Sequence, residues 1–437
     1  MQKGVGSIRL LIVLSASLIL TLDPSSYISS YVHLLHAQPS ISDTNLIVQP
    51  IVEGLSAPTD MIFLDKNNIL VLEKGGNVRL VRNGTLQNHP VLQISVNETG
   101  ENGLLGITMS IESKSPNSNI FLYYTNENPL RNRIYKFQWN GETLLNPSLI
   151  LDLPANIYLS HPTHNGGKMV IGPDGYLYAV IGDLANFGKL ENLLTGKDPD
   201  YTGSIFRVNP TNGSGASDNP FVASGQKNDM SKYYAYGIRN SFGMDFDPVT
   251  GNLWDTENGP NNYDEINLVR PGFNSGSYQV MGPLSLSNKT EDDLFNLPGS
   301  HYADPVFSWN NTVAPTDIEF FRSSKLGDEY TNNIFVGDIK RGNLYLFEVN
   351  ENRDGILLNS AQQKSGLSDL IVNSEEELSS VTFASGFGGI TDIETGPDGF
   401  LYVLSYYKEG EIVGGPYHLA KNYNGTIYRI SSNNTSP

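Results

Sequence analysis

The sequence predicts an all-β protein, a six-bladed β-propeller, on the strength of three observations. The composition favours turns and strands over helices, with 43 Gly, 24 Pro and 23 Tyr in 437 residues. No segment shows a long helical heptad pattern. A unit of loop, strand, turn, strand, loop and strand recurs six times along the chain. Six copies of a multi-strand unit fit a propeller much better than a sandwich.

Each copy of the unit begins with a loop that leads into a first strand. The six copies read "LSAPTDMIFL" (55–64), "ENGLLGITM" (101–109), "HNGGKMVIG" (164–172), "IRNSFGMDF" (238–246), "APTDIEFF" (314–321) and "GGITDIETG" (388–396). A turn and a second strand follow, in "DKNNILVLE" (65–73), "PNSNIFLYYT" (116–125), "GPDGYLYAVIGD" (172–183), "DPVTGNLWDTE" (247–257), "YTNNIFVGD" (330–338) and "GPDGFLYVLSY" (396–406).

A third strand completes each copy. These strands are "NVRLVRNG" (77–84), "RIYKFQWNG" (133–141), "SIFRVNP" (204–210), "EINLV" (265–269), "NLYLFEV" (343–349) and "TIYRISS" (426–432). The segment 44–53 is expected to add a strand to the last blade and so close the ring. One propeller domain is therefore predicted over residues 44–432.

The first strand of each blade in a propeller lines the central channel, so the loops before these strands open on one face near the axis. Polar residues in these loops are therefore expected to converge on one funnel. They are Asp60, Glu101, Asn102, His164, Arg239, Asn240, Thr316, Asp317, Thr391 and Asp392. A convergent polar cluster in a concave site is the default hypothesis for a binding site.

The charge of the chain argues against nucleic acid as a partner. The formal net charge is −18 and the sequence pI is about 4.7, whereas phosphate binding needs Lys and Arg. Any anionic ligand would need a local cluster of positive side chains, so each Lys or Arg in the funnel is informative.

The N-terminal residues resemble an export signal. Lys3 and Arg9 precede an apolar run, residues 10–22, and a small-residue segment follows at 36–40. Residues 1–37 are predicted to be a signal peptide or an N-terminal anchor, through which alone the protein would associate with a membrane. We expect a secreted or cell-surface protein.

One further feature of the sequence agrees with export. Glycosylation sequons begin at Asn83, Asn97, Asn212, Asn288, Asn310 and Asn424. The chain has no cysteine, so disulfides and thiolate metal sites are not available.

The chemistry of the funnel depends on few side chains. His164 is the sole histidine in the six loops, and its pKa range suits proton transfer near neutral pH; the alternative is a histidine that only bonds a neighbouring loop. Arg239 and Asn240 offer a fixed cation and an amide, unless Arg239 only pairs with an acid. Lys340 should point to the same face, although most loop lysines are simply solvated.

An acidic run, "TENGPNNYDEINL" (256–268), contains Glu257, Asp264 and Glu265 beside a Gly-Pro turn. Hard cations take carboxylate and carbonyl oxygens together, so this run is a candidate calcium site. The spacing does not match an EF-hand loop, and an ordinary acidic turn is the alternative.

Four segments together resemble a known family. They are "ENGLLGITM", "HNGGKMVIGPDGYLYAVIGD", "YAYGIRNSFGMDFDPVTGNLWDTENGPNNYDEINLV" and "GDIKRGNLYLF". The chain is similar from about residue 45 to 431 to the soluble sugar dehydrogenases that use pyrroloquinoline quinone (PQQ), the glucose/sorbosone dehydrogenase family. The resemblance implies a six-bladed propeller that binds PQQ and calcium and oxidises an aldose or oligosaccharide to its lactone, with an external electron acceptor.

The resemblance also implies roles for single residues. His164 would be the general base, and Arg239 would stabilise the charge that develops on the quinone. Glu101 and Asn165 would bind the sugar. Asn240 and Lys340 would join Arg239 in binding the cofactor. The main-chain oxygens of Gly259 and Pro260 would hold calcium, with Asp264 and Glu265 as further metal candidates.

The chain departs from the family pattern in two places. Gly389 and Thr391 stand where the family commonly has two arginines that clamp the cofactor, and such arginine–carboxylate pairs are poorly replaced. The stretch "NSGSYQ" (274–279) replaces an aromatic "NYGWP"-like stretch near further calcium sites. An alternative function is therefore a cofactor-free propeller that binds glycans or proteins at the cell surface, and a weaker one is a calcium-dependent sugar lactonase.

Overall fold

A computed structural model describes residues 39–110, 117–156, 162–222, 230–406 and 425–433 of the chain. The chain divides after residue 37, and all described residues belong to the unit of residues 38–437. The predicted signal peptide or anchor and the sequon at Asn424 lie outside the described residues. Within the part that the structure describes, no helix is long and apolar enough to cross a membrane.

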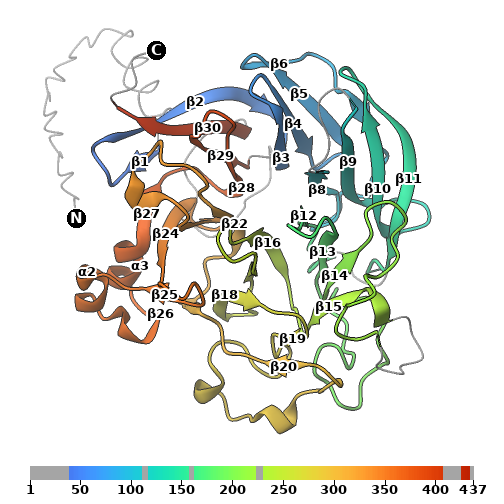
Figure 1. Ribbon diagram of the computed structural model, residues 1–437, viewed down its shortest axis with the longest axis vertical. Helices are drawn as coiled ribbons and strands as arrows, with labels where there is room; N and C mark the ends of the chain where they lie inside the picture. The colour runs from blue at the N-terminus through green and yellow to red at the C-terminus, as the bar shows by residue number, and fades with distance from the viewer. Residues whose placement is uncertain (1–38, 111–116, 157–161, 223–229, 407–424, 434–437) are drawn as a thin grey trace, which may run out of the picture. The chain divides into compact units, whose positions relative to one another are not determined.

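The described strands form six hydrogen-bonded sheets (Figure 1). The first contains β3 (Pro58–Asp65), β4 (Asn68–Glu73), β5 (Asn77–Arg82), β6 (Thr85–Leu86) and β7 (Leu92–Gln93). The second contains β8 (Leu104–Met109), β9 (Asn119–Asn126), β10 (Arg131–Trp139) and β11 (Leu144–Leu153). The third contains β12 (Met169–Ile171), β13 (Leu177–Ile181), β14 (Ser204–Val208), β15 (Tyr233–Tyr236), β19 (Phe273–Asn274) and β20 (His301–Tyr302).

The other three sheets complete the fold. The fourth contains β16 (Ser241–Phe246), β17 (Leu253–Glu257), β18 (Asn262–Val269), β21 (Phe307–Asn311) and β26 (Ile371–Val372). The fifth contains β22 (Pro315–Phe320), β23 (Ile334–Asp338), β24 (Asn343–Val349), β25 (Ile356–Leu357), β27 (Thr382–Ser385) and β1 (Ser40–Ile41). The sixth contains β28 (Ile390–Thr395), β29 (Leu401–Ser405), β30 (Gly425–Ser432) and β2 (Leu46–Leu55).

The six inner strands contact one another in a closed circuit, in the order β3, β8, β12, β16, β22 and β28. Between neighbouring sheets lie the hydrophobic cores; the core between the fourth and fifth sheets, for example, contains Trp254, Trp309 and Phe347. Two short helices, α2 (Ser360–Lys364) and α3 (Glu375–Val381), lie between strands of the fourth and fifth sheets in the chain. The sheets are thus arranged around an axis, as in a propeller.

The prediction of an all-β propeller is confirmed, but the six-bladed prediction, with six copies of one unit, needs correction. Five sheets present an inner strand of six or eight residues, whereas the third presents only the three residues of β12. The ring therefore has five full-length inner strands. The reason is local, because His164, Gly166 and Gly167 all adopt positive φ values (62°, 60° and 118°) that a regular strand does not accommodate.

The number of strands per sheet also departs from the predicted three-strand unit. The sheets have four, five or six strands, and the short strands β19, β20 and β26 pair in parallel with their neighbours. The predicted closing strand does form, since β2 pairs with β30 in the last sheet.

A repeated Thr-Asp dipeptide joins neighbouring inner strands. Thr59 Oγ1 donates to the Leu104 carbonyl (2.8 Å), and Asp60 Oδ2 accepts from the Ile107 amide (2.9 Å). The same two bonds run from Thr316-Asp317 to β28, at 2.6 and 2.8 Å. They run from Thr391-Asp392 to β3, at 3.1 and 3.0 Å. We call this arrangement the Thr-Asp clasp; each clasp satisfies backbone groups at the axis that no sheet ladder reaches.

In the other three inner strands, the position that corresponds to the clasp aspartate holds a different residue. At two of these positions a glycine brings two inner strands into direct contact. A Cβ on Gly106 would lie 2.0 Å from the Gly167 carbonyl oxygen, and one on Gly243 would lie 2.7 Å from the Asp317 Cα. Only glycine allows this approach of two backbones. The third such position is Lys168, whose side chain enters the axis.

Candidate functional site

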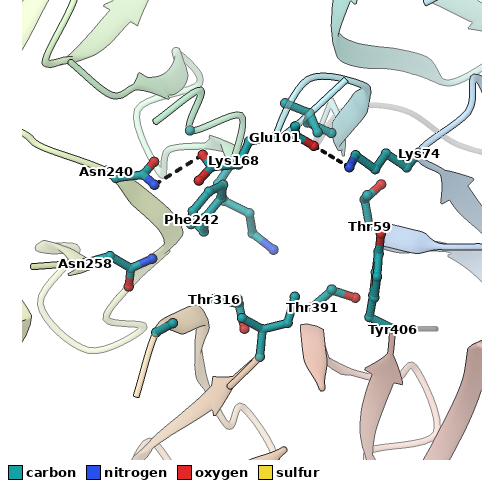
Figure 2. Close-up of a pocket in the computed structure, with 15 residues that line it drawn as sticks. Thr59, Lys74, Glu101, Lys168, Asn240, Phe242, Asn258, Thr316, Thr391 and Tyr406 are labelled. Carbon is teal, nitrogen blue, oxygen red and sulfur yellow. Dashed lines mark hydrogen bonds between the residues drawn. The ribbon is translucent and has the colours of Figure 1, made fainter. Parts of the chain in front are cut away.

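A cavity of about 290 Å³ lies at the axis of the ring (Figure 2). It is lined by Thr59, Lys74, Gly100, Glu101, Leu105, Gly166, Lys168, Asn240, Phe242, Asn258, Ala314, Thr316, Ile339, Thr391 and Tyr406. These residues come from all six sheets or the loops beside their inner strands, as the predicted funnel requires. The volume is at the lower end of the range for sites that enclose a small molecule.

His164 lies next to this cavity and forms a close pair with Asp183. Its Nδ1 is 2.6 Å from Asp183 Oδ1, and the side chains of the two residues are 14% and 5% exposed. The Asp183 amide in turn donates to the Arg239 carbonyl (2.8 Å), which fixes the carboxylate against the fourth sheet's loop. A carboxylate on Nδ1 orients the ring and leaves Nε2 as the nitrogen that can accept a proton.

Glu101 lines the cavity and holds the His164 loop. Its Oε2 accepts hydrogen bonds from the amides of His164 (2.5 Å) and Asn165 (3.4 Å) and from Asn240 Nδ2 (3.3 Å). Figure 2 shows Glu101 and Asn240 facing each other across one side of the cavity. This predicted sugar-binding residue is therefore at the cavity, but one of its two carboxylate oxygens is occupied by the protein.

Asn165, the second predicted sugar-binding residue, does not lie at the cavity as Glu101 does. It is fully buried, and its Oδ1 accepts from Asn132 Nδ2 (3.1 Å) inside the second sheet's edge. It does not line the cavity. Its position suits the support of the loop better than contact with a ligand.

Arg239 and Asn240 lie together at the loop before β16. Arg239 Nη1 donates to the carbonyl oxygens of Asn258 (2.7 Å) and Gly259 (3.2 Å). Asn240 lines the cavity, and its Oδ1 is buried without a hydrogen-bond partner. The Oδ1 of Asn258, also in the cavity wall, is buried and unpaired as well. Two such oxygens favour a ligand that donates hydrogen bonds.

Lys340 lies just behind the cavity wall, next to the lining residue Ile339. Its Nζ donates to the carbonyl oxygen (2.8 Å) and hydroxyl (2.9 Å) of Thr312. The main-chain amide of Arg239 donates to Glu257 Oε1 (2.6 Å). Within the described residues, the side chains of Lys340 and Arg239 form no ion pair and bond only uncharged oxygens. Their positive charge is thus not neutralised by direct contact, which favours an anionic group nearby.

The candidate calcium ligands are not brought together as one set. The Gly259 carbonyl already accepts from Arg239, and its amide donates to Asp264 Oδ1 (2.8 Å). Asp264 Oδ2 accepts from the amides of Val313 (2.5 Å) and Ala314 (2.7 Å). Asp264 and Glu265 are consecutive in β18, so their side chains point to opposite faces of the sheet.

Burial raises the pKa of each of these acids. The pKa of Asp264 is raised to about 6 by burial, against the hydrogen bonds from three amides. Burial, and then the charge of Glu257, raise the pKa of Glu265 well above its usual range. Pro260 lies in the turn between β17 and β18. Among the described residues, no group of three or more His, Asp or Glu side chains is arranged to hold a metal ion; a site made of main-chain oxygens would not appear as such a group.

The floor of the cavity is a buried lysine among aspartates. Lys168 Nζ lies 2.6 Å from Asp392 Oδ1, 3.0 Å from Asp317 Oδ1 and 3.5 Å from Asp60 Oδ1. Burial alone would lower the pKa of Lys168, but the charges of Asp317, Asp392 and Asp60 raise it well above its usual range. Lys168 therefore stays charged and is committed to the clasp aspartates.

Several residues of the site were not predicted. Lys74, Phe242 and Tyr406 line the cavity, and Asp183 pairs with His164. Asp183 ends the strand "YLYAVIGD", so its place at the channel end of a predicted strand was a usable signal. Phe242 and Lys74 carried none, because single aromatic and lysine residues recur throughout the chain.

Some features of the cavity suit a flat, anionic ligand, and others do not. Apolar and aromatic walls are supplied by Leu105, Phe242, Ile339 and Tyr406. Positive charge is supplied by the side chains of Arg239 and Lys340, which contact no carboxylate in the part of the chain that the structure describes. Thr391 lines the cavity where the family pattern has an arginine, and its hydroxyl is committed to the clasp. The residues thus fit PQQ through the two cations that are present, without the clamp expected at Gly389 and Thr391.

The fold and the site together define an all-β propeller with an axial cavity beside a histidine–aspartate pair. The family model for glucose/sorbosone dehydrogenases matches residues 55–414, and the chain belongs to this family.

Two curated relatives carry dehydrogenase names. The aldose sugar dehydrogenase YliI of Escherichia coli is 27% identical over 259 residues, which is 58% of this chain and 60% of that protein. Quinoprotein glucose dehydrogenase B of Acinetobacter calcoaceticus is 32% identical over 261 residues, which is 53% of this chain and 52% of that protein. Each alignment thus spans less than two thirds of the relative. The human hedgehog-interacting protein is also similar, at 25% identity over 37% of this chain and 25% of that protein.

Solved structures show the same fold. A chain from Thermus thermophilus with a provisional glucose dehydrogenase name is 28% identical, with a TM-score of 0.68 over 88% of this chain and 99% of that one. The PQQ-bound aldose sugar dehydrogenase of Streptomyces coelicolor has a TM-score of 0.64 over 90% of this chain and 100% of that one. Its 21% identity supports the fold alone.

Proposed function

We propose that the protein is an exported sugar dehydrogenase that oxidises an aldose at its anomeric carbon to the lactone, with PQQ as the hydride acceptor and an external electron acceptor thereafter. The observation that carries the proposal is the His164–Asp183 pair beside the axial cavity, in a chain of the glucose/sorbosone dehydrogenase family. PQQ supplies the redox chemistry when it is bound, and the protein supplies orientation and charge.

His164 is the group that removes the proton of the anomeric hydroxyl. With Nδ1 bonded to Asp183, the neutral ring keeps its lone pair on Nε2. The carboxylate then stabilises the imidazolium that forms, as in other histidine–aspartate pairs. Glu101 holds the His164 amide, so the base and the sugar-binding carboxylate belong to one rigid unit.

The remaining residues hold ligands. The unpaired oxygens of Asn240 and Asn258 can accept from sugar hydroxyls. Arg239, Asn240 and Lys340 would hold the cofactor, and the carbonyl oxygens of Gly259 and Pro260 would hold calcium. Arg239 now donates to the Gly259 carbonyl, so calcium would have to share that oxygen with the guanidinium.

The general-base role predicts a specific pair of variants. His164→Asn and Asp183→Asn should lower kcat for aldose oxidation by about 10²–10⁴-fold, because each removes positioned proton transfer. His89→Asn, a histidine of an outer groove, is the matched control. Activity would be followed with a dye acceptor over a panel of aldoses, after loading with PQQ and calcium. Full activity in His164→Asn would refute the role.

Cofactor binding can be tested without activity. Calorimetric titration of the protein with PQQ in calcium should show binding at micromolar concentrations or tighter, and Lys340→Met and Arg239→Met should weaken it. A chelator should abolish it. If the wild type does not bind PQQ, the absence of arginines at Gly389 and Thr391 has abolished cofactor binding.

A wild-type protein that does not bind PQQ would favour the alternative of a cofactor-free propeller that binds glycans or proteins. Its support is the replacement of both clamp arginines, together with the similarity to a hedgehog-interacting protein. Screening the protein against immobilised glycans would then be the next measurement.

Export is part of the proposal and has a separate test. Its support is the apolar segment in residues 1–37 and the sequons of the mature chain. Fractionation of the producing cells, with N-terminal sequencing of the protein, would show whether the segment is removed or retained as an anchor.

A further inference from the structure

Two large aromatic side chains are exposed on the described surface, and they contact each other. Phe187 is 53% exposed and Tyr278 is 55% exposed, whereas the other described Phe, Tyr and Trp side chains are buried or half-buried. The two rings meet edge to face, with centroids 5.3 Å apart. Exposed aromatic surface is uncommon in a protein that otherwise buries its aromatics, and such surface often marks a binding site.

The two loops that carry these rings are locked together by buried amides. Asn192 Nδ2 donates to Asn274 Oδ1 (2.9 Å), and Asn274 Nδ2 donates to Asn192 Oδ1 (2.8 Å). Asn192 also bonds the Ser277 carbonyl (2.6 Å), and the Tyr278 amide donates to the Glu191 carbonyl (2.8 Å). Both asparagines are fully buried. The aromatic pair is therefore held in place before any ligand arrives, which lowers the entropic penalty of binding.

The pair also lies close to the proposed general base. The Asn186 amide donates to the Asp183 carbonyl (2.7 Å), which closes a tight turn directly after the partner of His164. A turn of this kind keeps its first and fourth Cα atoms within about 7 Å, and the next Cα is about 3.8 Å further on. The Cα of Phe187 is thus within about 11 Å of the Cα of Asp183.

We infer that Phe187 and Tyr278 form an outer subsite for the second or third unit of an aldose-terminated oligosaccharide whose reducing unit lies at His164. The inference rests on the proposed function for the position of the reducing unit. The flat face of an aromatic ring packs against the C–H-bearing face of a pyranose, and the phenol of Tyr278 adds a hydrogen-bonding group. The pair would extend recognition of an oligosaccharide beyond its reducing unit.

The surroundings of the pair fit a sugar better than a protein partner. Polar groups of the same loop flank it, including Asn186 and the Lys189–Asp198 ion pair (2.7 Å). Leu194, 54% exposed, is the other large apolar side chain exposed in this loop. A stable protein interface buries about 800 Å² per partner, which two rings and a leucine do not supply.

The test compares binding of glucose with binding of maltotriose and cellotriose to the full chain without cofactor, by saturation-transfer NMR titration. Wild type should bind a trisaccharide about tenfold more tightly than glucose. Phe187→Ala and Tyr278→Ala should reduce this ratio to less than twofold and leave glucose affinity unchanged, and Tyr278→Phe should keep most of it. Val249→Ala, an exposed apolar residue of another loop, is the matched control and should keep the full ratio.

Each other outcome is decisive. Equal affinity of wild type for glucose and both trisaccharides would overturn the inference, and so would an unchanged ratio in Tyr278→Ala. A variant that slows turnover with a protein electron acceptor but not with a dye, at an unchanged binding ratio, would assign the pair to acceptor docking instead. Trisaccharide discrimination that depends on the pair in a protein without dehydrogenase activity would sink the proposed function and leave the subsite standing.

Discussion

His164 and Asp183 show how much of the site depends on the placement of single residues. His164 has a left-handed backbone conformation, and its amide bonds Glu101 while its ring bonds Asp183. The loop is therefore held on both its main chain and its side chain. A histidine fixed in this way keeps one tautomer, which is the requirement for a general base.

Glu191 carries the most direct pH prediction at this scale. Burial raises its pKa from 4.5 to about 7, against the hydrogen bond from Thr202 and with help from the charges of Asp200 and Asp183. The folded protein thus holds this proton more tightly than the unfolded chain does. The free energy of unfolding should fall as the pH rises from about 4.5 through about 7, by up to about 3 kcal/mol.

Glu191→Gln should remove that fall. The amide of Gln can donate to Thr202 Oγ1, which itself donates to Asp200 (2.6 Å). Thermal unfolding should therefore show a variant that is more stable than wild type at pH 8 and indistinguishable from it near pH 4. Glu376→Gln, exposed on α3, should match wild type at both. A Glu191→Gln protein less stable than wild type at pH 8 would contradict the prediction.

At the scale of elements, the Thr-Asp clasp explains why the inner strands stay together around a polar axis. Three of the six inner strands carry it, and each clasp reaches the next inner strand at residues three apart, such as Leu104 and Ile107. The same three aspartates surround Lys168. Asp60, Asp317 and Asp392 were predicted to lie in the ligand-binding funnel, but their carboxylates bond neighbouring inner strands and Lys168. Thr59, Thr316 and Thr391 still line the cavity.

Asp60→Ala should show the contribution of one clasp. The change leaves the Ile107 amide unpaired and removes one of the carboxylates of Lys168, which we expect to cost about 3 kcal/mol. Urea unfolding is the measurement, and Asp292→Ala, exposed, is the control and should change stability by less than about 0.5 kcal/mol. Equal stability of the two variants would mean that the clasp contributes nothing measurable.

At the scale of the molecule, the N- and C-terminal strands close the ring in one sheet. β2 and β30 pair from Leu46–Ser432 to Leu55–Gly425, so the second described strand holds the last one. The contacts that close the ring therefore join residues nearly the whole chain apart, and their loop entropy is large.

A disulfide across this closure tests its importance. Gln49 and Arg429 are partners in the pairing of β2 and β30, and the chain has no cysteine to compete. Gln49→Cys with Arg429→Cys should stabilise the oxidised protein by up to about 5 kcal/mol through the unfolded state. The melting temperature should rise when the bond forms and return on reduction, and the single variants should not respond to reductant. If the disulfide forms and the melting temperature does not rise, either the disulfide strains the folded protein or the pairing of β2 and β30 is already lost before the main unfolding transition.

Much of the fold was predictable because each strand carries its own signal. Turns such as "GPDG" followed by β-branched and aromatic residues mark strands locally, and all six predicted second strands form. The outer strands were largely missed because short strands such as β6, β7 and β26 have two residues each and no periodic pattern. The shortening of the inner strand β12 to three residues was also missed. It depends on the positive φ values of His164, Gly166 and Gly167, which the presence of two glycines in the sequence does not specify.

The site was predictable in part of its membership, since Glu101 and Asn240 line the cavity, but not in Lys74, Phe242 and Tyr406 or in its contacts. The sequence by itself determined the all-β class, the six repeated segments, the family and the convergence of His164, Glu101 and Asn240 on one face, because these follow from local patterns and repeat geometry. Only the tertiary structure decided that Asp183 pairs with His164, that the clasp aspartates bind Lys168 and that Asn165 is buried. The pair His164–Asp183 joins the segments before β12 and after β13 of one sheet. The contacts of Lys168 and Asn165 join residues of different sheets. All of them depend on distances that the packing of the loops and the ring sets, and no local pattern in the sequence encodes those distances.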